Sequence, residues 1–264
     1  MKNSNEIQNN GLLWVNITQR EEKVLRAMQK RFQLDDQEIK ESLPSFQRPK
    51  FVKRGNYYFM VLHFPVFDRK TRRLGFTEID FFLNNNSLIT VHDDKLPVIE
   101  QFFKECQKNQ NLTGQYFQGT AARLFFELVS RLLNAIFPIL LHVTEDMNSV
   151  DKILFTKNPD KKMVEEILRL KTNTVNFRRA MQGHKNVLEH LVGHGGRELD
   201  LPSYQNYINT VREHVNEIWH TLESQKESID ALHETNESVV GLHMNEIMRT
   251  LTIISVITFP LTLV

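Results

Sequence analysis

The sequence closes with NEIMRTLTIISVITFPLTLV (residues 245–264), and this stretch decides how the fold is interpreted. Residues 251–264 are largely apolar. As a helix rising about 1.5 Å per residue they extend roughly 21 Å, short of the ~30 Å hydrocarbon core of a bilayer. Three interpretations follow: a buried terminal helix, an anchor in the membrane interface, or the first part of a membrane-spanning helix.

The polar residues of this stretch favour the membrane-spanning helix over a buried soluble one. Spaced at about 100° per residue, the hydroxyl side chains fall within an arc of about 120°, with Asn245 close to its edge. An interfacial helix carries Lys or Arg on its polar face. Hydroxyls and amides are typical of a bundle interior or a water-filled pore. The hydroxyl residues are Thr252, Ser255, Thr258 and Thr262, and the opposite side holds Ile253, Val256, Ile257, Pro260 and Leu261.

A long amphipathic helix precedes this stretch. With Ser203 as its N-cap, and with no proline from 203 to 259, one helix is predicted from about residue 204 into the apolar tail. Such a helix spans roughly 70 Å before the apolar segment begins. It indicates a stalk that leads into a membrane span, and the alternative is a soluble coiled-coil scaffold. The apolar positions follow an a/d register, interrupted at Gln225 and Asn236: Ile208, Val211, Val215, Ile218, Leu222, Ile229, Leu232 and Val239.

The rest of the chain is first α/β and then helical. Strands are predicted in residues 12–17, 46–54, 57–67, 74–83 and 87–93, with helices over 19–32 and 97–108. Thr18 and Glu21 form a capping box before the first helix. A long helix over 120–154, kinked at Pro138, precedes a second that opens at Asn158–Pro159 and closes at Gly193.

The predicted fold class is therefore α/β. An N-terminal mixed-sheet α/β/α domain is followed by long helices, the last of which is a stalk leading into a membrane span. We expect an α/β domain over 1–115, a helical hairpin packed with it over 116–202, the stalk over 203–250, and the start of a first membrane helix, truncated, over 251–264.

Composition excludes several classes of function. The net charge of +1 over 264 residues gives no global field for nucleic acid, so the basic segments 48–54 and 68–73 are interpreted as solvated. Cys106 is the single cysteine, which indicates a reducing compartment. The sequence has no phosphate-binding loop, dinucleotide fingerprint or recognisable catalytic triad motif, so no enzyme is predicted.

The residues resemble the CorA-type family of divalent metal cation (Mg²⁺/Co²⁺) transporters. NEIMRTLTIISVITFPLT (245–262) is similar to the family's junction between stalk and first membrane helix, and WVNIT (14–18), FQRPKF (46–51) and LITVH (88–92) give weaker support. The resemblance implies the cytoplasmic part of a funnel-shaped homopentameric channel in the inner or plasma membrane. The signature Gly-Met-Asn of the family would lie beyond Val264.

Site residues follow from the same resemblance. Residues on the pore-lining face would be Asn245, Met248, Leu251, Ser255, Phe259 and Thr262. Asn245 and Thr262 would offer oxygens to a hydrated Mg²⁺, and Met248 and Leu251 an apolar constriction that gates by dewetting. Simple helix–helix packing is the alternative role for these two side chains.

A regulatory cation site is implied between Asp68 and the stalk of the next subunit. Asn209–His214 (NTVREH) resembles the family's Arg-Asp-Val-x-Asp-His, but Thr210 replaces the key aspartate. Glu213 is a substitute on the same helix, pointing about 60° away from position 210. A plain turn residue is the alternative for Asp68.

Two histidines raise the question of zinc. His190 and His194 have the spacing of four that can hold Zn²⁺ on a helix, but Gly193 is expected to break that helix between them. A Zn²⁺ transporter of the same family remains an alternative function.

Overall fold

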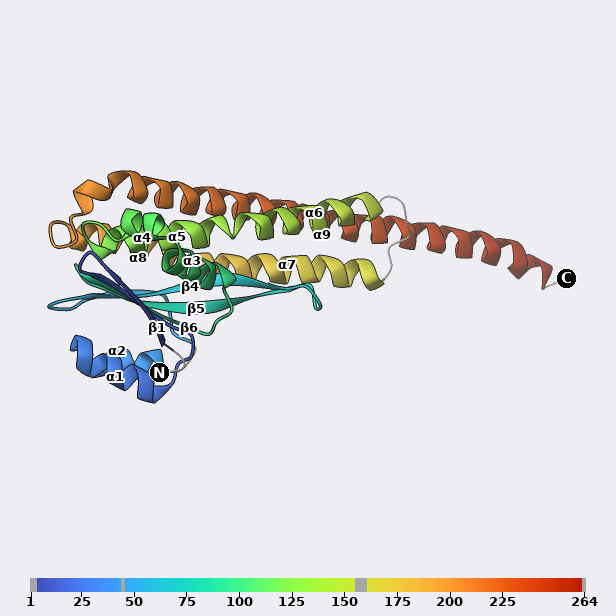
Figure 1. The fold of residues 1–264 in the computed structure, drawn as a ribbon. Helices are drawn as coiled ribbons and strands as arrows, with labels where there is room; N and C mark the ends of the chain where they lie inside the picture. Colours follow the sequence, from blue (N-terminus) through green and yellow to red (C-terminus); the bar gives the residue numbers. More distant parts are fainter. Residues whose placement is uncertain (1–3, 44–45, 155–160, 263–264) are drawn as a thin grey trace.

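The computed structural model describes residues 4–43, 46–154 and 161–262. A sheet and a helical bundle occupy one end of an elongated molecule, and a single helix projects from the other end (Figure 1). The strands are β1 Ser4–Asn9, β2 Leu12–Ile17, β3 Lys50–Lys53, β4 Tyr58–Asp68, β5 Arg73–Leu83 and β6 Ser87–His92. The helices are α1 Glu22–Phe32, α2 Asp36–Ser42, α3 Pro97–Lys108, α4 Gln110–Tyr116, α5 Ala121–Asn134, α6 Phe137–Leu154, α7 Lys161–Met181, α8 His184–Gly195, the 3-10 turn η1 Leu201–Tyr204, and α9 Gln205–Leu261.

The six strands form one mixed sheet in the order β1-β2-β6-β5-β4-β3. Strand β2 runs parallel to β6, whereas the other neighbours are antiparallel. Alternate side chains of β4 enter two different cores, because successive residues of a strand point to opposite faces. Met60 and Leu62 pack toward α5, while Phe59 and Val61 pack toward α1 and α2. The α/β/α class predicted from the sequence is confirmed.

Two local predictions near the N-terminus were wrong. The capping box fails because Glu21 is itself the N-cap of α1 and no side chain caps the helix. Strand β1 was not predicted, since its polar sequence buries only Ile7 at the edge of the sheet. The predicted strand over 12–17 and helix over 97–108 are confirmed as β2 and α3.

The helix predicted over 120–154 is two helices. It breaks at Ala135–Ile136, immediately before α6, so Pro138 is the second residue of a new helix, where its missing N–H costs little. By length and composition, the run 121–154 is the one candidate membrane span among the described residues, but half of its most apolar window is buried in the molecule. We therefore interpret α5 as a core helix.

The second predicted helix is also divided. Its start at Asn158–Pro159 lies outside the described residues, and the helix breaks between α7 and α8. A Cβ on Gly183 at this break would lie 2.1 Å from Pro49 Cβ, so a glycine is required where the helices pass the segment before β3. Gly193 does not end the helix, because α8 continues to Gly195.

Candidate functional site

The long helix α9 begins in the bundle and ends outside it. Its N-terminal two-thirds pack against α5, α7 and α6. The predicted a/d seam is buried there, with Gln225 and Asn236 buried in the same seam. Gln225 Nε2 donates to the Leu140 carbonyl at 2.9 Å and to Thr144 Oγ1 at 3.0 Å, which links α9 to α6 across the seam. The buried seam residues are Ile208, Val211, Val215, Ile218, Leu222, Ile229 and Leu232.

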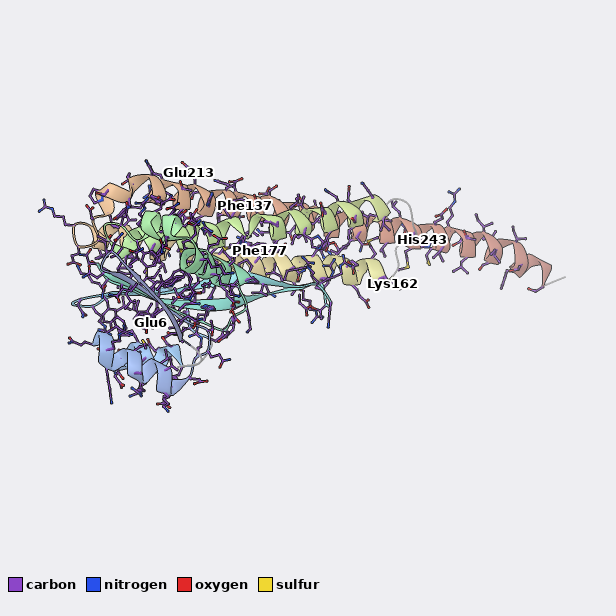
Figure 2. The ribbon with its side chains drawn as sticks, viewed as in Figure 1. Glu6, Phe137, Lys162, Phe177, Glu213 and His243 are labelled. Atoms are coloured by element: carbon purple, nitrogen blue, oxygen red, sulfur yellow. The ribbon has the colours of Figure 1, made fainter. Side chains whose placement is uncertain are left out.

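Past Val239 the helix leaves the bundle, and its apolar residues become exposed (Figures 1 and 2). His243 marks the start of this projecting segment, residues 240–262, in Figure 2. Leu242 and Phe259 are each 70% exposed, and Val256 is 67% exposed. Arg249 is the last charged residue of the sequence. An exposed helix that is largely apolar is typical of a membrane span or a partner interface.

All six predicted pore-lining residues lie on this projecting segment and are exposed. Within the unbroken α9 they share an arc of about 120°, which runs from Leu251 to Asn245. The structure therefore places them on one face, with three apolar and three uncharged polar side chains. They are Asn245, Met248, Leu251, Ser255, Phe259 and Thr262.

The hydroxyls of this segment donate to carbonyls one turn earlier in the same helix. Ser255 Oγ lies 2.8 Å from the Leu251 carbonyl, and Thr258 Oγ1 lies 2.9 Å from that of Ile254. Thr262 Oγ1 lies 2.9 Å from the Phe259 carbonyl. Such a bond satisfies the hydroxyl proton but leaves the oxygen lone pairs free to accept from a hydrated cation.

Asp68 is engaged in a turn. It ends β4, and its Oδ1 accepts from the backbone N–H groups of Lys70 and Thr71 at 2.8 and 3.4 Å, while Oδ2 accepts from Thr71 Oγ1 at 2.9 Å. The bond from the Thr71 hydroxyl, followed by that from the Lys70 amide, lowers the pKa of this carboxyl. Asp68 is therefore ionised at neutral pH, and it is exposed.

Within one chain, Asp68 and Glu213 are not neighbours. Glu213 is exposed near the start of α9 (Figure 2), whereas the β4–β5 hairpin that carries Asp68 points along the molecule toward the start of α7 (Figure 1). Thr210 is likewise exposed, and its hydroxyl donates to the Asn206 carbonyl at 3.0 Å. Any site that combines Asp68 with Glu213 therefore requires two subunits.

His190 and His194 share one exposed face of α8. Their ring centroids lie 5.9 Å apart, and both rings lie near Phe51. His194 Nδ1 is 2.8 Å from the His190 carbonyl, so that nitrogen is already bonded. Among the residues that the structure describes, no group of three or more His, Cys, Asp or Glu is arranged to hold a metal ion.

Sequence reasoning missed a cavity between α7, the start of α8, and α9. Its basic residues include Lys171, Lys185 and Lys226, which come from three different helices. A local pattern gives no sign of such a site, because these residues meet only when the helices pack. The six residues predicted on the projecting segment, in contrast, lie on one helix, and the family resemblance was enough to name them.

Comparisons with known proteins agree on one family. The family model described as CorA-like Mg²⁺ transporter protein matches residues 9–264. The cobalt/magnesium transport protein CorA of Thermotoga maritima is 23% identical over 252 residues, which cover 95% of this chain and 70% of that protein. The complete structure of the CorA magnesium transporter from Methanocaldococcus jannaschii matches with a TM-score of 0.79 at 17% identity, over 95% of this chain and 77% of that one. The ZntB cytoplasmic domain from Vibrio parahaemolyticus matches with a TM-score of 0.69 at 13% identity, over 91% of this chain and 90% of that one.

Proposed function

This chain belongs to the CorA-like Mg²⁺ transporter family, and from that membership we propose that it is the cytoplasmic and pore-entrance part of a homopentameric divalent cation channel. Mg²⁺ is its cargo, and Co²⁺ is a second one, as in the name of the Thermotoga maritima relative. The observation that carries the proposal is the projecting segment, a largely apolar helix end that carries no charge after Arg249 and continues from a packed bundle.

The pore face runs along α9 and combines two kinds of surface. Asn245 offers an amide oxygen, and Ser255 and Thr262 offer hydroxyl oxygens whose protons are already bonded. Such oxygens suit a Mg²⁺ ion that keeps its first water shell, because this ion dehydrates reluctantly. Met248 and Leu251 form an apolar ring in the assembled channel, which closes by excluding water and opens when it is wetted.

Membrane placement follows from the charges along α9. Glu246 and Arg249 mark the polar border of the projecting segment, and no charged residue follows. Arg at the end of a span is typical of the cytoplasmic side, where its long side chain reaches the headgroups. The sheet and bundle then lie in the cytoplasm, and the segment after Arg249 enters the inner or plasma membrane.

Cation flux through the full-length protein in liposomes tests the proposal. We expect Mg²⁺ to enter vesicles that hold a Mg²⁺ indicator, and Asn245→Leu to slow entry about tenfold because one ring of oxygens is lost. Asn206→Leu is the matched control, since Asn206 is equally exposed on α9 but lies in the bundle. Equal flux in both variants would contradict the assigned pore face.

Experiments on the same liposome preparation distinguish two alternative functions. A Zn²⁺ transporter of the family would carry Zn²⁺ in preference to Mg²⁺ and Co²⁺ when the three are supplied separately. A soluble coiled-coil scaffold would stay with the aqueous fraction when the protein is mixed with vesicles and floated on a density gradient.

Regulation by bound Mg²⁺ is a separate part of the proposal. Asp68 of one subunit and Glu213 of the next supply carboxylates that Mg²⁺ draws together, and loss of the ion lets them repel. Asp68→Asn keeps an acceptor for the Lys70 and Thr71 amides but removes the charge. We expect millimolar Mg²⁺ to raise the melting temperature of the wild type and not that of Asp68→Asn. An equal rise in both would leave Asp68 as a turn residue.

A further inference from the structure

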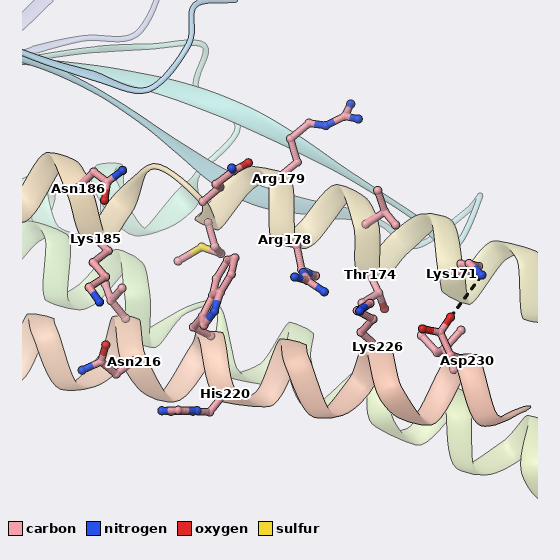
Figure 3. A pocket seen from close by; sticks show the side chains of 16 residues that line it. Lys171, Thr174, Arg178, Arg179, Lys185, Asn186, Asn216, His220, Lys226 and Asp230 are labelled. Atoms are coloured by element: carbon pink, nitrogen blue, oxygen red, sulfur yellow. Dashed lines mark ion pairs between the residues drawn. The ribbon is translucent and has the colours of Figure 1, made fainter.

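A large cavity runs between α7 and α9, at a distance from the projecting segment. Its volume is about 930 Å³, which is ample for a small organic ligand. Figure 3 shows Lys171, Lys226 and Asp230 close together toward one end, with Lys185, Asn186 and Asn216 toward the other. We call this cavity the basic groove, and it is defined by Lys171, Arg178, Lys185, Trp219 and Lys226.

The basic groove holds more positive charge than its carboxylates neutralise. Lys171 is paired with Asp230 at 3.3 Å, and Arg178 with Glu223 at 2.6 Å. Among the described residues, Lys185 and Lys226 have no carboxylate within ion-pair distance. Both are exposed, although Figure 3 shows their side chains between the two helices that wall the groove. An anion can therefore enter without displacing an existing ion pair.

The middle of the groove offers planar and apolar surfaces. The Arg178 guanidinium lies 5.4 Å from the centre of the half-buried Trp219 ring. Guanidinium and indole planes are the groups on which proteins stack nucleobases. Buried Met181, Val215 and Ile229 also line the groove. Along α9 the groove thus presents amides at one end, the Arg178–Trp219 pair in the middle and ammonium groups at the other end.

We propose that the basic groove binds a nucleoside phosphate in its metal-free form. The base stacks on the Arg178–Trp219 pair with one edge toward the amides of Asn186 and Asn216, and the ribose and then the phosphates extend toward Lys171 and Lys226. From Asn216 to Lys226 the helix rises about 15 Å, a span comparable to that of an extended nucleoside triphosphate. The site goes beyond cation transport, and its existence does not depend on that function.

Preference for the metal-free form follows from the charges of the groove. It supplies ammonium and guanidinium groups, and Asp230 is the one carboxylate among the residues that line it. Mg²⁺ bound to a triphosphate cancels two of its negative charges and occupies the oxygens that the lysines would contact. The groove is therefore occupied when Mg²⁺ is scarce relative to nucleotide. The bound nucleotide contacts α9, the helix that continues into the projecting segment.

Calorimetry and tryptophan fluorescence on the full-length protein test this site, with ATP as the probe. In EDTA we expect saturable binding that quenches fluorescence, because Trp14 is fully buried and Trp219 is the accessible indole. Excess Mg²⁺ should weaken binding about tenfold. Lys226→Gln should weaken it about tenfold in EDTA, since one charge-assisted contact is lost. Lys104→Gln is the control, because Lys104 is an exposed lysine on α3.

The base and the phosphates are tested separately. Tripolyphosphate should bind more weakly than ATP and without quenching, and Trp219→Phe should weaken ATP and leave tripolyphosphate unchanged. Several results would overturn the proposal: no saturable binding to the assembled protein, equal losses in Lys226→Gln and Lys104→Gln, or ATP binding that strengthens with Mg²⁺. Tripolyphosphate that binds as tightly as ATP would reject a nucleoside ligand.

Discussion

At the scale of single residues, the most consequential feature is a buried arginine beneath the sheet. Arg20 Nη1 lies 2.6 Å from Asp80 and its Nη2 lies 3.1 Å from Glu78, and the three side chains are 5%, 0% and 1% exposed. Arg20→Met would leave two buried carboxylates without their cation, so we expect the free energy of unfolding to fall by about 3–5 kcal/mol. Urea unfolding measures this loss.

The matched control for that variant is Arg26→Met on α1. Arg26 forms exposed ion pairs with Asp36 and Glu22, and such pairs contribute about 1 kcal/mol or less. If both variants lost the same stability, the buried position of Arg20 would have no special role.

Asp80 makes stability depend on pH in an unusual direction. Complete burial, the largest influence, raises the pKa of this carboxyl to about 7; Arg20 opposes the rise and Glu78 adds to it. The unfolded chain has a pKa of about 3.9 at this position. Between these values the folded protein binds more protons, so its stability is fully present below about pH 4 and falls as pH rises toward 7.

Asp80→Asn removes this titration and so tests it. From pH 5 to 8 we expect the wild type to lose stability relative to the variant, by up to about 1.4 kcal/mol per pH unit. Because Glu78 interacts with Asp80, the difference between the two proteins reports the titration of the carboxyl pair. Urea unfolding at several pH values gives the comparison, and a difference that stays constant with pH would rule out the raised pKa.

At the scale of secondary-structure elements, Asn173 and Asn176 attach α7 to the start of β5, and Asn176 does so by donating to the Leu74 carbonyl at 3.0 Å. Asn173 is buried, accepts from the Leu74 amide at 2.9 Å and donates to the Arg72 carbonyl at 2.9 Å. Asn173→Leu keeps the volume but leaves the Leu74 amide without this partner, which costs about 1–3 kcal/mol. Thermal unfolding measures the cost, and Asn148→Leu on the exposed face of α6 should change little.

The elements that could be predicted from the sequence are those with a local pattern. Strands β4 to β6 carry β-branched and aromatic runs, and α9 carries its seam and has no proline before Pro260, so each was found near its observed bounds. The break at Gly183 was missed because it depends on contact with Pro49, far away in the sequence. The basic groove was missed for the same reason, because its residues come from three helices, whereas the six residues predicted to line a pore lie on one helix.

Helix α9 should show two levels of protection along its length. Residues 208–232 are packed in the bundle, whereas residues 242–259 have no packing partner in the described chain. Hydrogen exchange of the full-length protein should therefore be slow in the first region both in a non-denaturing detergent and in lipid nanodiscs. In the second, exchange should slow about tenfold or more on transfer from that detergent to the nanodiscs. Unchanged exchange on that transfer would contradict membrane insertion.

At the scale of the whole molecule, one helix belongs to both the soluble bundle and the projecting segment. Displacement of α9 against α7 moves the projecting segment with it, because the helix is continuous and contains no proline between 203 and 259. The contacts that hold it are interrupted by polar groups, such as Gln225 and the ion pair between Lys171 and Asp230. A ligand bound in the bundle that shifts α9 would therefore also shift the projecting segment.

We expect opening of the assembled channel to depend on which face of α9 receives a polar substitution. Leu251 and Ile253 are similarly exposed, at 53% and 50%, but they point about 160° apart on the helix. Leu251→Asn would keep the apolar constriction wetted. Because a barrier lowered by about 1.4 kcal/mol increases a rate tenfold, we expect Mg²⁺ entry into liposomes to rise about tenfold. Ile253→Asn would face lipid, lower the yield of inserted protein and leave the flux per inserted channel unchanged. A rise in flux with both variants would mean that loosened packing, rather than wetting of the pore face, opens the channel.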